Sequence, residues 1–126
     1  MNDERGKIWD IRERSFEYAL RAIKLDQCLQ EGKDSAGWII AKQYLRSATS
    51  IGANVAEAQS GESRADFIHK YNIAQKEARE SLYWLRLLAQ SGILPTTRLT
   101  PLIRETEEII AVITAIIVTA KHNKRS

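Results

Sequence analysis

The stretch from Phe67 to Leu88 constrains the fold most strongly, because its side chains sort onto two opposite sides of one helix. With about 100° between successive residues, spacings of three and four return a side chain to the same side. One side carries Phe67, Tyr71, Ala74, Ala78, Ser81, Leu85 and Leu88. The other carries His69, Asn72, Lys76, Arg79, Tyr83 and Arg86. The stretch therefore predicts an amphipathic helix whose outer face bears three fixed positive charges and one aromatic ring.

Four segments of the chain share this periodicity and predict four helices joined by short connections. The predicted helices are residues 10–30, 35–59, 63–90 and 98–122. Gly32 follows the first, as glycine often does where a helix ends. Asp34 or Ser35 is suited to cap the second, because a short polar side chain accepts a hydrogen bond from a free backbone N–H. Ser63 and Asp66 resemble a capping box at the start of the third.

Small residues line the expected inner side of the second helix. That side consists of Trp38, Ala41, Leu45, Ala48, Gly52 and Val55. Because alanine and glycine leave little side chain between two backbones, we expect a neighbouring helix to approach closely here. The inner side of the first helix consists of Ile11, Ser15, Tyr18, Ala22, Leu25 and Leu29.

Amphipathic helices with short connections form bundles, so the sequence predicts an all-α protein. We expect one domain, residues 1–126, folded as an antiparallel up-down-up-down four-helix bundle. Residues 109–120 are rich in β-branched side chains, but no partner strand is evident and the helical spacing continues through them. This run is also too short to span a bilayer, so a membrane is not an expected partner.

The predicted bundle has more large apolar side chains than one interior needs. Residues 109–120 are apolar nearly all round, and the third helix carries further apolar side chains beside its inner face. At about 1.5 to 3 kcal/mol for each large side chain buried, leaving about five of them in water would remove much of a fold's net stability. We therefore expect a homo-oligomer. Its predicted interface consists of Ile73, Trp84, Leu87, Ile110 and Ile117.

Positive charge is concentrated in the second half of the chain, although 19 basic and 16 acidic residues give a net charge of only +3. Such clustering suits a polyanion, and the alternative is a merely solvated surface. Basic side chains would contact phosphates, and Tyr83 would stack on an unpaired base. The predicted nucleic-acid-binding residues are Lys70, Lys76, Arg79, Tyr83, Arg86, Lys121, Lys124 and Arg125, the last three in a basic tail at 121–126. With no sequence-reading motif evident, we expect recognition by shape and charge.

Enzyme chemistry finds little support in the sequence. A carboxylate-bridged metal site in a bundle needs two Glu-x-x-His motifs, whereas only Asp66-x-x-His69 approaches one. Cys28, the single cysteine, has no histidine nearby in sequence to activate it. We expect no catalytic residue, metal or cofactor. The lone cysteine and the lack of a signal-peptide pattern predict a cytoplasmic location.

A motif lies at the junction between the second and third predicted helices. Residues 43–58 read QYLRSATSIGANVAEA and residues 63–70 read SRADFIHK, with KEARE at 76–80 and YWLRLL at 83–88. In these segments the chain resembles the four-helix-bundle family named after proteins encoded in intervening sequences of large-subunit ribosomal RNA genes. It is also similar to the accessory variability determinant of diversity-generating retroelements, a relative in the same superfamily. The resemblance spans about residues 11–117.

The resemblance implies a bundle that assembles into a ring of five, a homopentamer, without catalytic activity. In the retroelement relative, the basic surface of the ring engages nucleic acid and the reverse transcriptase. The motif residues are Arg46, Asn54, Glu57, Arg64 and Asp66. Asn54 and Glu57 either contact a ligand or pair with Arg46, Arg64 or Arg79. The Arg46 guanidinium fits a carboxylate as readily as a phosphate.

Two functional hypotheses of different classes follow. The first is a non-enzymatic oligomeric adaptor that binds RNA or DNA through its basic faces, with a reverse transcriptase as protein partner in a diversity-generating retroelement. The second is an orphan intervening-sequence-type scaffold without nucleic acid, in which Trp84, Leu87 and Ile73 dock a protein partner.

Overall fold

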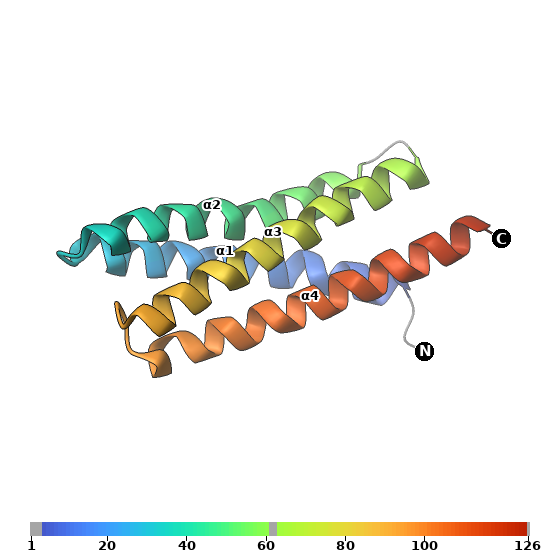
Figure 1. The fold of residues 1–126 in the computed structure, drawn as a ribbon. Coiled ribbons are helices and arrows are strands. Elements are labelled where there is room, and N and C mark those ends of the chain that lie inside the picture. Colours follow the sequence, from blue (N-terminus) through green and yellow to red (C-terminus); the bar gives the residue numbers. More distant parts are fainter. Residues whose placement is uncertain (1–3, 61–62, 126) are drawn as a thin grey trace.

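The structure is a computed structural model that describes residues 4–60 and 63–125, and these form four helices with no strand among them (Figure 1). The helices are α1 (Glu4–Glu31), α2 (Ser35–Ala58), α3 (Arg64–Ser91) and α4 (Thr96–Arg125). Consecutive helices run antiparallel and pack against each other, and α4 closes the bundle against α1. The predicted all-α class and four-helix bundle are confirmed.

Polar caps and one glycine set the helix boundaries between α1 and α4. The Asp34 carboxylate accepts a hydrogen bond from the Gly37 N–H at 3.0 Å, and α2 begins at the next residue. The Ser63 hydroxyl oxygen accepts one from the Asp66 N–H at 3.1 Å and caps α3. Gly92 ends α3 with a φ of 80°, a left-handed conformation that glycine adopts without steric cost.

Two helices are longer than predicted. α1 begins by Glu4 rather than at residue 10, because a single glycine in its first turn does not stop a helix. α4 begins at Thr96 and continues to Arg125, so residues predicted as a basic tail belong to the helix. The reason is that residues 102–125 contain neither glycine nor proline, and nothing ends the helix earlier.

The core follows the predicted periodicity in α1 and α3. All six residues predicted for the inner side of α1 are buried. In α3 the buried residues are Ile68, Tyr71, Ala74, Ala78, Ser81, Leu85 and Leu88, so Ile68 takes the place predicted for Phe67, which is half-buried. In α4, Thr106, Ile109, Ile113 and Ile116 face the core.

The inner side of α2 is rotated from the predicted line. Tyr44 and Ile51 are fully buried, whereas Trp38 is exposed and Leu45 lies at the edge of the core. The Tyr44 hydroxyl can be buried because it donates a hydrogen bond to the Tyr18 hydroxyl at 3.0 Å. The prediction for Trp38 is therefore wrong, whereas Leu45 packs against the core from its edge and Tyr44 takes the central position.

Hydroxyl groups from all four helices pair inside the bundle. The Tyr18 hydroxyl lies 2.6 Å from Thr106 Oγ1, and Ser47 Oγ lies 2.8 Å from Ser81 Oγ. Burial raises the pKa of Tyr18 to about 12 and also raises the pKa of Tyr44. These paired hydroxyls satisfy polar groups that would otherwise destabilise the core.

The predicted close approach of α2 to a neighbouring helix is confirmed at Gly52. A Cβ atom added there would lie 3.3 Å from the backbone oxygen of Ser15 in α1. A larger residue would press directly on the α1 backbone, so the absent side chain helps to set the spacing between α1 and α2.

Candidate nucleic-acid interface

The outward side of α3 presents the predicted basic residues in exposed positions. Lys76, Arg79, Tyr83 and Arg86 are all exposed, and Tyr83 retains 58% of its accessible surface. They lie on the outer side because the residues on the opposite side of α3 are buried in the core.

The exposed arginines of α3 lie toward α4. Gln75 Nε2 donates a hydrogen bond to Thr114 Oγ1 of α4 at 2.7 Å, which identifies the side of α3 that faces α4. Arg79 and Arg86 follow Gln75 by four and eleven residues, spacings that keep them on that side. Lys121, exposed on α4, follows Thr114 by seven residues. The fold therefore places basic side chains of both helices along one face, which we call the α3–α4 face.

A hollow lies beside the aromatic ring on this helix. It has a volume of about 240 Å³ and is lined by Tyr83, Arg86, Leu87 and Gln90. The Tyr83 ring packs edge-on against Trp84, with the ring centroids 5.0 Å apart. A ring held in place beside a guanidinium and an amide is the combination that stacks a base and contacts its phosphate.

Arg79 and Arg86 form no ion pair with any residue in the described ranges. Lys76 differs, because its charge lies close enough to Glu80 to act on that carboxyl. The pKa of Glu80 is lowered mainly by a hydrogen bond from Trp84 Nε1 at 3.0 Å, and Lys76 contributes a smaller part. The two arginines are thus the α3 charges most available to a phosphate group.

The remaining predicted binding residues differ in their surroundings. Lys70 Nζ lies 2.7 Å from Glu57 Oε1 of α2, so this charge already has a carboxylate partner. Lys124 and Arg125 belong to the last turn of α4, and their side chains lie outside the described part of the structure. Sequence alone had no means of separating paired from unpaired charges, because the pairing depends on the neighbouring helix.

Two of the five motif residues hold α2 and α3 together. Arg46 pairs with Glu77 Oε1 at 3.2 Å and also with Glu80, so its guanidinium bridges to two carboxylates of α3. Glu57 pairs with Lys70 of α3, whose Nζ lies 2.7 Å from Glu57 Oε1. Asn54 donates a hydrogen bond to the Ser50 carbonyl oxygen within α2 at 2.8 Å.

The other two motif residues, Arg64 and Asp66, lie in the first turn of α3 and are exposed. A negative charge there is favourable, because the free N–H groups of a helix N-terminus carry partial positive charge.

Residues 7–115 of the chain match the sequence profile of the family described as 23S rRNA-intervening sequence protein. The chain belongs to this family. The match includes the motif at residues 43–70, so the resemblance to intervening-sequence proteins is confirmed, while the relation to retroelement accessory proteins stays a prediction.

A solved structure supports the same assignment. The chain is similar to the crystal structure of a protein with unknown function from the S23 ribosomal protein family of Bacteroides thetaiotaomicron VPI-5482. The two are 38% identical, the TM-score is 0.80, and the match covers 88% of this chain and 97% of the other. No curated protein matches the chain.

In this intervening-sequence protein the residues predicted for an oligomer interface have different degrees of burial. Ile117 is only 6% exposed and belongs to the core, so its prediction as an interface residue is corrected: its own subunit already buries it. Ile110 and Trp84 are partly buried against the core, and Ile73 is half-buried. Leu87 is exposed.

The outer side of α1 carries exposed apolar residues that were not predicted from the sequence. Phe16, Leu20 and Ile23 are all exposed, and Phe16 retains 66% of its accessible surface. Their spacing of four and three residues places them on one side of the helix, and we call them the α1 stripe. That spacing was a usable signal, but charged residues between them conceal it.

Within residues 4–60 and 63–125 the structure contains no group of three or more His, Cys, Asp or Glu side chains able to hold a metal ion. Cys28 is half-buried, and its sulfur lies 3.3 Å from Arg98 Nη2. None of the described helices combines the length and apolar character needed to cross a membrane.

Proposed function

We propose that this protein is a non-enzymatic oligomeric adaptor that binds RNA or DNA through the α3–α4 face. One observation carries the proposal: Arg79 and Arg86 lie exposed without ion-pair partners in the described chain, next to Tyr83 and its hollow. A surface that only contacts water has no need of an exposed aromatic ring beside unpaired guanidinium groups. A surface that binds a nucleic-acid strand uses both, the ring for a base and the guanidinium groups for phosphates.

Affinity in this proposal comes from repetition of the face. One subunit contributes few fixed charges, and each phosphate contact alone is weak at physiological salt. Several copies binding one strand make the later contacts intramolecular, so their contributions multiply. The homo-oligomer, expected as a ring of five from the resemblance, is therefore part of the proposed function.

The proposed ligand is a flexible or unpaired strand recognised by charge and stacking. Bases stack on tyrosine through their faces, which every base has, so little dependence on base identity is expected. Replacing Tyr83 by leucine should weaken binding to a single strand by roughly 5- to 150-fold, corresponding to about 1 to 3 kcal/mol for one stacked base. Binding to a duplex should change much less.

The decisive test is fluorescence anisotropy with a labelled single strand and a labelled duplex. The variant Arg79→Glu with Arg86→Glu should abolish binding to both while the assembly survives. Its matched control is Lys24→Glu with Lys33→Glu, which makes the same change of net charge at exposed positions on α1 and the connection that follows it. Equal loss of binding in both variants, or binding unchanged in the first, would contradict the proposed face.

The partner in a retroelement would be a reverse transcriptase. Neighbouring genes distinguish this role from the orphan type: a reverse transcriptase gene with a template repeat supports an accessory protein, and a position inside a 23S ribosomal RNA gene supports the orphan type. If the wild-type protein binds neither strand, the protein-docking scaffold replaces the adaptor as the better hypothesis.

A further inference from the structure

Two glutamates interrupt the basic sequence of α3. Glu77 and Glu80 are the only acidic residues between Lys70 and Arg104, and both follow Lys76 within four positions. Opposite charges four residues apart on a helix lie close enough to pair, so an unrestrained Glu80 would neutralise Lys76. The positive charge on the outer side of α3 therefore depends on where these two carboxylates lie.

Arg46 of α2 holds both carboxylates toward α2. Its Nη1 lies 3.2 Å from Glu77 Oε1, and its Nη2 pairs with Glu80 Oε2. The side chains of Glu77 and Glu80 are only 15% and 30% exposed. Trp84 Nε1 donates a hydrogen bond to the same Glu80 oxygen at 3.0 Å, so two donors fix this carboxylate. We call these four residues the Arg46 clamp.

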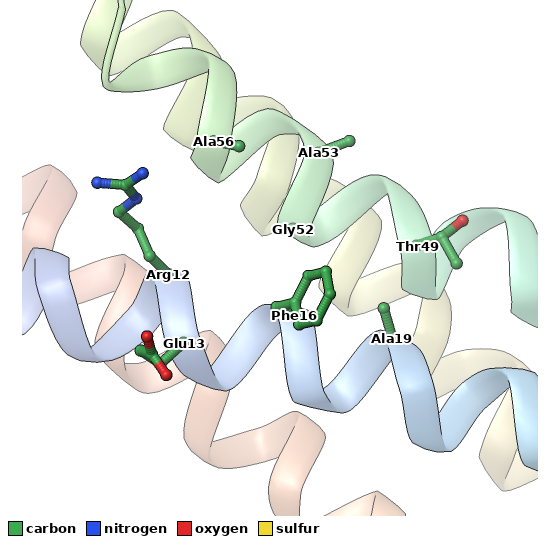
Figure 2. A pocket seen from close by; sticks show the side chains of 8 residues that line it. All are labelled: Arg12, Glu13, Phe16, Ala19, Thr49, Gly52, Ala53 and Ala56. Atoms are coloured by element: carbon green, nitrogen blue, oxygen red, sulfur yellow. The ribbon is translucent and has the colours of Figure 1, made fainter.

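Arg46 reaches α3 from one side of α2, and another side of the same helix faces α1. Gly52, Ala53 and Ala56 line a hollow of about 500 Å³ between α1 and α2 (Figure 2). Arg46 precedes Gly52 by six residues, which places it about 120° around the helix from that glycine. Its guanidinium group therefore acts on the carboxylates of α3 and lies outside the α3–α4 face.

The clamp affects the charge of α3 more than the stability of the fold. The Arg46 side chain is half-exposed, and ion pairs in contact with solvent contribute little to folding. Trp84 and Arg46 lower the pKa of Glu80, and Lys76 does so to a smaller extent, so these groups compete for one carboxylate. Removing Arg46 leaves Lys76 as a charged partner within reach of Glu80.

We propose that Arg46 is a positioning residue for nucleic-acid binding, which acts by keeping the Glu80 carboxylate away from Lys76. The clamp separates charge across α3, with the carboxylates toward α2 and the basic groups outward and toward α4. This inference rests on the proposed function and adds to it a residue that acts through another side chain rather than through a phosphate.

The test is fluorescence anisotropy with a labelled single strand at low and high salt, on Arg46→Gln, Glu80→Gln and the variant with both changes. Arg46→Gln should weaken binding roughly two- to fivefold at low salt, the effect of one surface ion pair, and less at high salt. Glu80→Gln keeps an oxygen for the Trp84 hydrogen bond but carries no charge. Adding it to Arg46→Gln should therefore restore the affinity of the wild type, whereas Glu80→Gln alone should have little effect.

Lys42→Gln is the matched control. Lys42 precedes Arg46 by one turn of α2, and its Nζ lies 3.3 Å from Asp26 Oδ2 of α1. The control variant loses the same charge and also breaks an ion pair, but the carboxylate that it releases belongs to α1. It should weaken binding less than Arg46→Gln does. Arg46→Lys, which keeps the charge, should fall between the wild type and Arg46→Gln.

Two results would overturn the inference alone, in a wild type that binds the strand through Arg79 and Arg86. If Glu80→Gln fails to restore binding to Arg46→Gln, Arg46 acts by holding the helices together or by contacting the strand itself. If Lys42→Gln weakens binding as much as Arg46→Gln, net charge explains the loss. A wild type that binds no strand is a different result, because it contradicts the proposed function and this inference together.

Discussion

Replacing Gly52 by alanine sets helix propensity against packing, and the structure determines which effect is larger. Alanine is favoured over glycine in a helix interior by about 1 kcal/mol, so propensity alone would stabilise the variant. The new methyl group would lie 3.3 Å from the Ser15 carbonyl oxygen and 3.4 Å from its carbonyl carbon. Those are backbone atoms of α1, and they move only if the helix moves.

Overpacking of this kind costs about 1 to 3 kcal/mol, which exceeds the gain in propensity. We expect Gly52→Ala to lower the free energy of unfolding by about 1 kcal/mol and the melting temperature by about 3 to 5 °C. Urea unfolding followed by circular dichroism, at one fixed protein concentration, measures the effect.

Gly37→Ala is the matched control in the same helix. Its added Cβ would lie 3.2 Å from Ile93 Cγ2, the end of a side chain that can shift. We therefore expect this variant to be neutral or slightly stabilised. If Gly52→Ala were stabilised as much as Gly37→Ala, the contact with Ser15 would not limit how closely α1 and α2 approach, and the reasoning would be refuted.

Three further predictions concern stability. Below pH 10 the Tyr18 hydroxyl is protonated in both the folded and the unfolded chain. Between pH 10 and 12 the unfolded chain loses this proton while the folded chain keeps it, so stability should fall by up to about 3 kcal/mol. Urea unfolding of Tyr18→Phe should show a smaller alkaline loss, and an equal loss would refute this. Ser63→Ala removes the cap of α3 and should cost about 1 kcal/mol in thermal unfolding, whereas no change would mean that the cap is dispensable. Arg46→Ala should cost less than about 1 kcal/mol, because its pairs are half-exposed, and a larger loss in urea unfolding would show a stronger bridge.

Sequence periodicity located the core where large apolar side chains recur strictly, as in α1 and most of α3. It failed in α2, which is rich in alanine, serine and glycine, so that several lines along the helix are nearly equivalent. Tyr44 takes the buried position in α2. Its polar hydroxyl can be buried because it donates a hydrogen bond to the Tyr18 hydroxyl. That partner lies on another helix, and the local pattern carries no information about it.

The candidate interfaces were predictable to different degrees for the same reason. Exposure of Arg79 and Arg86 follows from their place opposite the core of α3. The pairing of Lys70 with Glu57 depends on the packing of α2 against α3, which the pattern of α3 does not contain. Ile117 was misassigned because α4 is apolar nearly all round, so its spacing does not separate the inner side from the outer one.

The most direct test of the account is the salt dependence of binding to a single strand, compared between the wild type and Arg79→Ala with Arg86→Ala. In one subunit, losing two phosphate contacts would change the slope of log K against log salt by about 1.4. If several copies share one strand, the slope should change by clearly more than this. A change of about 1.4 would contradict a shared basic surface, and an unchanged slope would contradict the α3–α4 face as the binding site.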